Sequence, residues 1–200
     1  MFSSIIAFLV MLNPFALFLY LLPIIKELNL RSFAVVLFKA SITALVILFL
    51  FFFFGKSIFN NIFHIYFDSF RIFGGIILFT YAFMFIVNGK KAFITLKEDL
   101  NKLASEIAVP FIIGAGTISL AVLLGKDYEI LKGSTIIVIV LIVNYAIIYT
   151  LAVLRHFLYK KQMQTIFDNN MEFLLRVSGF FIGAIGVDMV VKGIENLTGG

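Results

Sequence analysis

The chain is a succession of apolar stretches, each about as long as a bilayer-spanning helix. A transmembrane helix needs about 20 largely apolar residues. Six stretches meet this requirement: Ser4–Ile25, Phe33–Phe54, Phe70–Asn88, Ile107–Leu124, Ser134–Leu158 and Phe173–Ile194. The segments between them are short and charged or glycine-containing, and none can hold a soluble domain. The sequence therefore predicts an all-α polytopic membrane protein with six transmembrane helices in a single transmembrane domain, residues 1–200.

The composition agrees with this class and excludes others. The chain is 62% hydrophobic and 14% charged, whereas a soluble domain is roughly half apolar and a quarter charged. It has no Cys, and its two His are far apart in sequence, so thiolate sites are excluded and a catalytic metal site has little support. We expect no cofactor, no metal and no enzymatic activity. The net charge of +5 is spread over short connectors, which indicates membrane topology rather than nucleic-acid binding.

The basic residues also predict the orientation of the chain in its membrane. Of the 16 Lys and Arg residues, eleven lie in or beside the odd-numbered connectors and five lie in or beside the even-numbered connectors and at the C-terminal end. Cytoplasmic loops carry the excess of Lys and Arg. We therefore expect a multi-pass protein of the cell (inner) membrane with both termini outside the cytoplasm and the lipid bilayer as its main partner. A homo-oligomer is compatible with this arrangement.

The longest connector, residues 90–106, divides the chain near its midpoint and has the pattern of a short amphipathic surface helix. Residues 1–89 and 107–200 each contain three predicted spans, and each half begins with a span that is interrupted. Pro14 removes an N–H donor from the first span, beside the amide of Asn13. The fourth span is interrupted at the corresponding depth by Pro110-Phe-Ile-Ile-Gly114-Ala115-Gly116-Thr117.

The two halves match each other in further positions. When the third span is aligned with the sixth so that Arg71 matches Arg176, Gly74 also matches Gly179 and Met84 matches Met189. A repeat of three spans must insert upside down relative to its twin, so the halves are predicted to be inverted repeats. Paired interrupted helices in two halves of a chain are the best sequence indication of a transporter's binding site.

At these residues the chain resembles the MarC family of six-span membrane proteins, which is grouped with LysE-type exporters. Asn13-Pro14 matches the start of the family's first-span motif, although Ala16, Leu17 and Leu19 replace its Gly, Asn and Pro. The other matching segments are Pro110…Gly114-Ala115-Gly116-Thr117, with Ala115 in place of Pro, Arg71-Ile72-Phe73-Gly74-Gly75, and Arg176…Gly179…Ala184-Ile185-Gly186-Val187-Asp188-Met189…Gly193-Ile194. The resemblance covers essentially the whole chain and implies ion- or proton-coupled transport of small neutral amino acids by some relatives.

Several polar residues are candidates for the transport site, each with a structural alternative. Gly114, Gly116 and Thr117 could present helix-end N–H groups to an anionic group, or they could serve close helix packing. Asn144 could line a pathway or hydrogen-bond another helix. Together with Asn13, Pro14 and Ala115, these residues form the predicted substrate-binding set.

Charged residues at the ends of spans are candidates for coupling or for substrate contact. Asp188 lies inside the sixth span, where a charge is costly and usually functional. Its alternative is an ion pair with Lys192, four residues on and on the same helix face. Arg71 and Arg176 open the last span of each half. They could contact a substrate carboxylate, clamp the broken helices through backbone carbonyls, or extend to lipid headgroups.

The sequence thus favours a secondary transporter of small solutes with its site between Asn13-Pro14 and Pro110–Thr117. The alternative is a membrane assembly or interaction protein that transports nothing, in which the interruptions serve packing.

Overall fold

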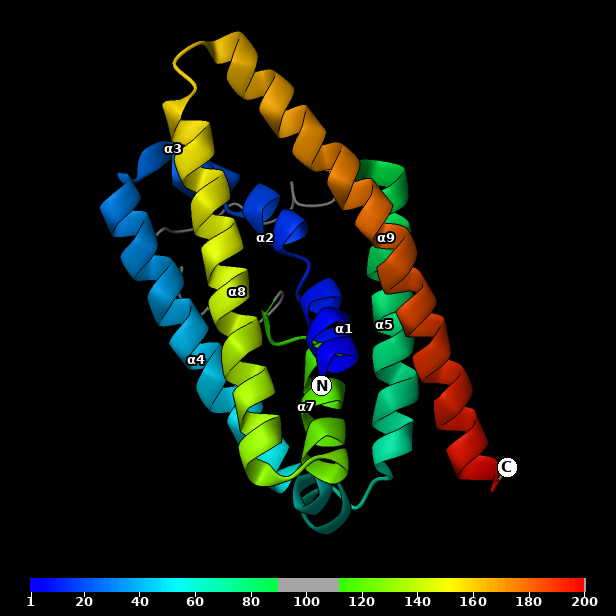
Figure 1. Cartoon of the computed structure of the whole chain (residues 1–200). Helices are drawn as coiled ribbons and strands as arrows, with labels where there is room; N and C mark the ends of the chain where they lie inside the picture. Colours follow the sequence, from blue (N-terminus) through cyan, green and yellow to red (C-terminus); the bar gives the residue numbers. More distant parts are fainter. Residues whose placement is uncertain (90–111, 200) are drawn as a thin grey trace.

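The computed structural model describes residues 1–89 and 112–199, and every regular element within these ranges is helical (Figure 1). The all-α prediction is confirmed. In chain order the elements are α1 (Phe2–Leu12), α2 (Pro14–Tyr20), α3 (Leu22–Glu27), α4 (Leu30–Ser57), the π-helical turn η1 (Ile58–Ile62), α5 (Phe67–Asn88), α7 (Ala115–Asp127), α8 (Ile130–Phe157) and α9 (Lys161–Thr198).

Five segments of the described chain are long and apolar enough to cross a bilayer: Phe2–Tyr20, Leu30–Gly55, Phe67–Asn88, Ile130–Phe157 and Lys161–Thr198. They correspond to the first, second, third, fifth and sixth predicted spans. The fourth predicted span begins outside the described residues. Its described part, α7, has 13 residues and is about 20 Å long. The predicted amphipathic connector 90–106 and Pro110 also lie outside the described ranges.

Helix α9 is longer than the span predicted over Phe173–Ile194. It has 38 residues and begins at Lys161, so it includes most of the connector predicted before the sixth span. The polar composition of that segment indicated a loop. However, neither Gly nor Pro occurs between Lys161 and Gly179, so the backbone has no reason to leave the helix there.

The described helices pack into two groups that meet at α2. One hydrophobic cluster joins α2 to α1, α3, α4, α7 and α8. The other joins α2 to α5 and α9. Figure 1 shows α5 and α9 side by side at one side of the molecule, with α4 and α8 at the other. Because α2 contributes to both clusters, the helix break that precedes it lies where the two groups meet.

Helices α5 and α9 are antiparallel and lie in close contact (Figure 1). A Cβ atom added to Gly75 would lie 2.5 Å from the carbonyl oxygen of Gly186, and one added to Gly186 would lie 2.8 Å from that of Gly75. Small residues allow membrane helices to approach to this distance. An antiparallel pair of third spans is what an inverted repeat requires, although the repeat itself stays a prediction.

A polar contact joins the first residues of the chain to the end of α7. The amino terminus donates a hydrogen bond to the Tyr128 hydroxyl over 3.1 Å, and the Ser4 and Tyr128 hydroxyls are 2.9 Å apart. The hydrogen bond with Ser4, followed by the one from the amino terminus, lowers the pKa of Tyr128. Helix α1 therefore starts beside the end of α7, and the two helices run in opposite directions.

Candidate functional site

The first predicted interruption is a true break between two helices. Helix α1 ends at Leu12, and α2 begins at Pro14. Asn13 between them is left-handed, with a φ of 43° and a ψ of 74°. Asn tolerates this conformation better than most residues do. Its Oδ1 accepts a hydrogen bond from the Ala16 N–H at 3.2 Å and so caps α2. The break thus depends on Asn13 for the turn and the cap, and on Pro14 for the missing donor.

A second break lies directly before α7. Gly114 is extended, with φ −96° and ψ 169°, and α7 begins at Ala115. The Thr117 hydroxyl accepts a hydrogen bond from the Gly114 N–H at 3.0 Å and lies within 3.0 Å of the carbonyl oxygens of Ile112 and Gly114. Thr117 therefore fixes the chain as it enters α7. The N–H groups of the first turn are left directed away from the helix body, at the positive end of the helix dipole.

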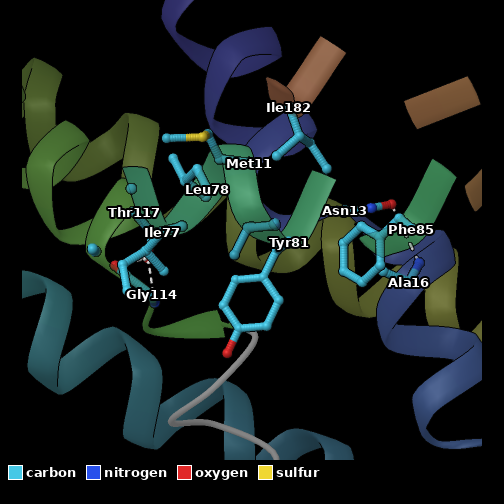
Figure 2. A pocket seen from close by; sticks show the side chains of 13 residues that line it. Met11, Asn13, Ala16, Ile77, Leu78, Tyr81, Phe85, Gly114, Thr117 and Ile182 are labelled. Carbon is cyan, nitrogen blue, oxygen red and sulfur yellow. Dashed lines mark hydrogen bonds between the residues drawn. The ribbon is translucent and has the colours of Figure 1, made fainter. Parts of the chain in front are cut away.

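The two breaks meet at one cavity (Figure 2). Its volume is about 60 Å³, and it is mostly apolar. The lining brings together predicted site residues of both breaks with side chains of α1, α5 and α9: Met11, Leu12, Asn13, Ala16, Ile77, Leu78, Tyr81, Phe85, Gly114, Ala115, Gly116, Thr117 and Ile182. Five of the predicted substrate-binding residues line it. Pro14 is buried beside the cavity without lining it.

Gly116 allows the breaks to approach each other. A Cβ atom at this position would lie 2.3 Å from the Met11 methyl carbon and 2.6 Å from a Leu78 methyl carbon. Both of these side chains line the cavity. A larger residue at position 116 would therefore push them into the space that the cavity now leaves open.

Asn13 contributes a buried amide group to the lining of the cavity. Its side chain is 4% exposed. Oδ1 also lies 3.2 Å from the Ser178 hydroxyl of α9, whereas Nδ2 is buried without a hydrogen-bond partner among the described residues. An unpaired buried donor is costly. The free Nδ2 therefore suits a solute or a water molecule in the cavity.

Two polar groups at or beside the cavity were not predicted from the sequence. Ser178 contacts Asn13 from α9, and Tyr81 lines the cavity from α5 with its hydroxyl directed away from Met11 and Leu78 (Figure 2). The signal for both is weak. Each is a single polar residue within an apolar span, as many packing residues of membrane helices are.

The structure places Asn144 outside the lining of this cavity. It lies on α8 with no exposed surface, and neither its Nδ2 nor its Oδ1 has a hydrogen-bond partner in the described part of the chain. The interhelical hydrogen bond offered as its structural alternative is thus not made there.

Asp188 also lies away from the cavity lining. Its carboxylate is 2.8 Å from the Lys192 ammonium, and both side chains are more than half exposed. This ion pair is the alternative that the spacing of the two residues indicated.

The two predicted arginines occupy different surroundings. Arg176 donates hydrogen bonds to the carbonyl oxygens of Ile86 and Val87, at 2.5 and 3.3 Å, and to Glu172 at 3.1 Å. It thereby ties α9 to the last turn of α5. Arg71 is 8% exposed, and it forms a long ion pair with the Asp68 carboxylate, at 4.0 Å. Neither residue lines the cavity.

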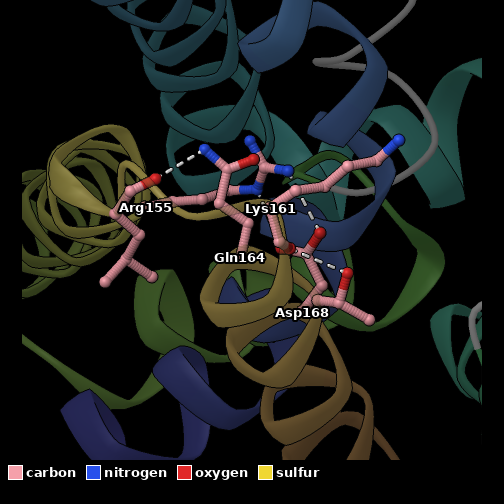
Figure 3. A network of polar contacts seen from close by, with 6 residues as sticks. Arg155, Lys161, Gln164 and Asp168 are labelled. Atoms are coloured by element: carbon pink, nitrogen blue, oxygen red, sulfur yellow. Dashed lines mark hydrogen bonds and ion pairs between the residues drawn. The ribbon is translucent and has the colours of Figure 1, made fainter.

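A buried ion pair joins α8 to α9 (Figure 3). Arg155 donates to both carboxylate oxygens of Asp168, over 2.8 and 3.1 Å, and the side chains are only 9% and 13% exposed. Gln164 closes the same corner by donating to the Leu158 carbonyl oxygen at 2.8 Å. No local sequence pattern indicates this pair, because Arg155 and Asp168 are 13 residues apart and lie on two different helices.

Comparison with known proteins supports a membrane role for the whole chain. Residues 1–198 match the model of the MarC family of integral membrane proteins. The chain is similar to a UPF0056 membrane protein of Pyrococcus horikoshii, with 29% identity over 96% of this chain and 91% of the relative. It is also similar to one of Aquifex aeolicus, with 26% identity over 98% and 92%. No solved structure matches the chain. The resemblance found in the sequence is therefore confirmed, and the chain belongs to the MarC family of integral membrane proteins.

Proposed function

We propose that this protein is a secondary transporter of small polar solutes and that the cavity between the two helix breaks is its solute site. The observation that carries the proposal is the meeting of both breaks at one cavity in the interior of the bundle. Transporters bind solutes at such paired interruptions, because helix ends offer backbone groups that an intact helix would use internally.

The cavity offers donors and acceptors from opposite sides. The first turn of α7 contributes N–H groups, and Asn13 adds its free Nδ2. Helix α1 contributes carbonyl oxygens. Met11 and Leu12 of α1 line the cavity. The Ala16 N–H donates to Asn13 in place of the Leu12 carbonyl oxygen, its usual acceptor in a continuous helix. This arrangement suits a zwitterion whose carboxylate faces α7 and whose ammonium group faces the end of α1.

The size of the cavity limits the solute. A volume of about 60 Å³ accommodates roughly four water molecules, so the solute is small. Small neutral amino acids, which the family resemblance implies, meet both requirements. The sequence has no ATPase motif, so uphill transport would use an ion or proton gradient.

Counterflow in proteoliposomes tests the proposal. We expect vesicles loaded with alanine or glycine to take up labelled substrate, and Gly116→Ala to slow this uptake. The added Cβ atom drives the ends of Met11 and Leu78 into the cavity. A loss of about 1.4 kcal/mol in solute affinity would reduce apparent affinity roughly tenfold.

The matched control is Gly183→Ala on α9. An added Cβ atom at Gly183 meets only the Cβ of Ala82, at an ordinary contact distance of 3.4 Å. Its uptake should equal that of the unmodified protein. If no small amino acid exchanges through folded protein, or if both variants behave alike, the cavity is not the solute site, and the role in assembly becomes the better explanation.

A further inference from the structure

Ser119 on α7 is a buried hydroxyl that its surroundings leave unpaired. Its side chain is 1% exposed, and Oγ has no hydrogen-bond partner among the described residues. Several helical hydroxyls in the described part of the chain donate to the carbonyl four residues earlier, as Ser41 and Thr80 do at 2.9 Å. Ser119 does not. An unsatisfied polar group is costly in a membrane interior, so water or a solute is the expected partner of this hydroxyl.

Arg71 on α5 presents a second unpaired group. The residue is 8% exposed, its Nε has no partner within the described chain, and its ion pair with Asp68 is long at 4.0 Å. Asp68 is itself engaged by Asn196 at 2.8 Å. A guanidinium group has five N–H donors. Because the Asp68 carboxylate is 4.0 Å away, most of the N–H donors of Arg71 are left to hydrogen-bond with water.

The two unpaired groups lie at the same level of one helix interface. Helices α5 and α7 run in opposite directions (Figure 1). A Cβ atom added to Gly74 would lie 3.0 Å from the Cβ of Ala115, which fixes the register. Arg71 precedes Gly74 by three residues, and Ser119 follows Ala115 by four, so each lies about one turn further toward the same end of the bundle.

We propose that Arg71 and Ser119 line a hydrated passage between α5 and α7. It leads from the end of the bundle where Asp68 and Asn196 lie to the cavity at Ala115. The contact between Gly74 and Ala115 separates the passage from the cavity in this structure. Its occupants are water and polar solutes. Its use as a solute route rests on the proposed function, whereas its hydration does not.

Cysteine labelling tests the passage directly, because the chain has no Cys of its own. Single variants Ser119→Cys, Ala121→Cys and Lys132→Cys are exposed in membrane vesicles to a small membrane-impermeant methanethiosulfonate. Lys132 is well exposed at the start of α8, so its variant identifies the accessible side. Ala121 is fully buried on the same helix as Ser119. The Ser119→Cys thiol should react roughly tenfold faster than that of Ala121→Cys, since the reagent needs a hydrated thiolate.

The charge of the reagent provides a second measurement, directed at Arg71. An anionic methanethiosulfonate should react with Ser119→Cys faster than a cationic one, and Arg71→Gln should reduce this preference. Equal rates for Ser119→Cys and Ala121→Cys, whether both slow or both fast, would overturn the passage. A preference that Arg71→Gln leaves unchanged would remove Arg71 from it. Labelling requires no transported solute, so failure of counterflow and failure of the passage are separate results.

Discussion

At the scale of single residues, Asn13 combines three tasks that few other side chains could perform together. It takes the left-handed conformation that ends α1, it caps α2 through Oδ1, and it leaves Nδ2 buried without a hydrogen-bond partner among the described residues. Gly would supply only the first of these tasks and Ser only the cap, whereas Asp would supply the first two but no N–H donor. The amide has both an acceptor and a donor. The fold uses the acceptor, Oδ1, and leaves the donor, Nδ2, for the proposed solute.

Asn144, in contrast to Asn13, is a buried amide that makes no hydrogen bond within the described part of the chain. We expect Asn144→Leu to raise the free energy of unfolding by about 1–3 kcal/mol, because the substitution removes a side chain that is buried without hydrogen bonds. Thermal unfolding of the purified protein in detergent, followed by circular dichroism, measures this change. Counterflow of the same variant separates the two hypotheses for Asn144. Greater stability with reduced uptake supports a pathway residue, whereas lower stability would show that a hydrogen-bond partner exists.

At the scale of elements, the corner between α8 and α9 depends on the buried pair Arg155–Asp168. Asp168→Asn should lower the free energy of unfolding by about 3 kcal/mol, since a buried guanidinium group would lose its counter-charge. The double variant Arg155→Leu/Asp168→Leu should recover most of the loss, because no charge is left buried. Thermal unfolding of the three proteins decides this, and a double variant no more stable than Asp168→Asn would contradict it.

The spans and the helix breaks follow from local sequence, whereas the contacts between distant helices do not. The spans were predictable because apolar length is a local property, and the break at Asn13 because Pro14 cannot donate. The breaks could be paired because both interrupt the first span of a half. The contact of Ser178 with Asn13 joins residues far apart in sequence, and no local pattern indicates it. The extent of α9 was missed because polar residues describe solvent exposure and not helix propensity.

At the scale of the whole molecule, the cavity lies where two packed units meet. Helices α5 and α9 form one unit through glycines in direct backbone contact, and α4, α7 and α8 belong to the other. Side chains of both units line the cavity. If α5 and α9 move together against α7, the contact between Gly74 and Ala115 opens and the passage at Arg71 and Ser119 joins the cavity. Such a motion would provide the alternating access that the proposed secondary transport requires.

Paired cysteines test which helices move relative to each other. The variant Gly74→Cys/Ala115→Cys places thiols across the interface between α5 and α7, where the Cβ positions are 3.0 Å apart. A disulfide there should abolish counterflow when copper phenanthroline oxidises it, and a reductant should restore the rate. Disulfides typically have Cβ atoms about 3.8 Å apart, so a small adjustment of the helices is sufficient.

The control bridge lies within the unit that is expected to move as one body. Gly183→Cys/Ala82→Cys joins α9 to α5 at Cβ positions 3.4 Å apart, close to the usual disulfide geometry. Its oxidation should leave counterflow unchanged, because the bridge spans no moving interface. If both disulfides stop counterflow, α5 and α9 also slide against each other. If neither does, the interface between α5 and α7 stays closed throughout transport, and the solute must reach the cavity by another route.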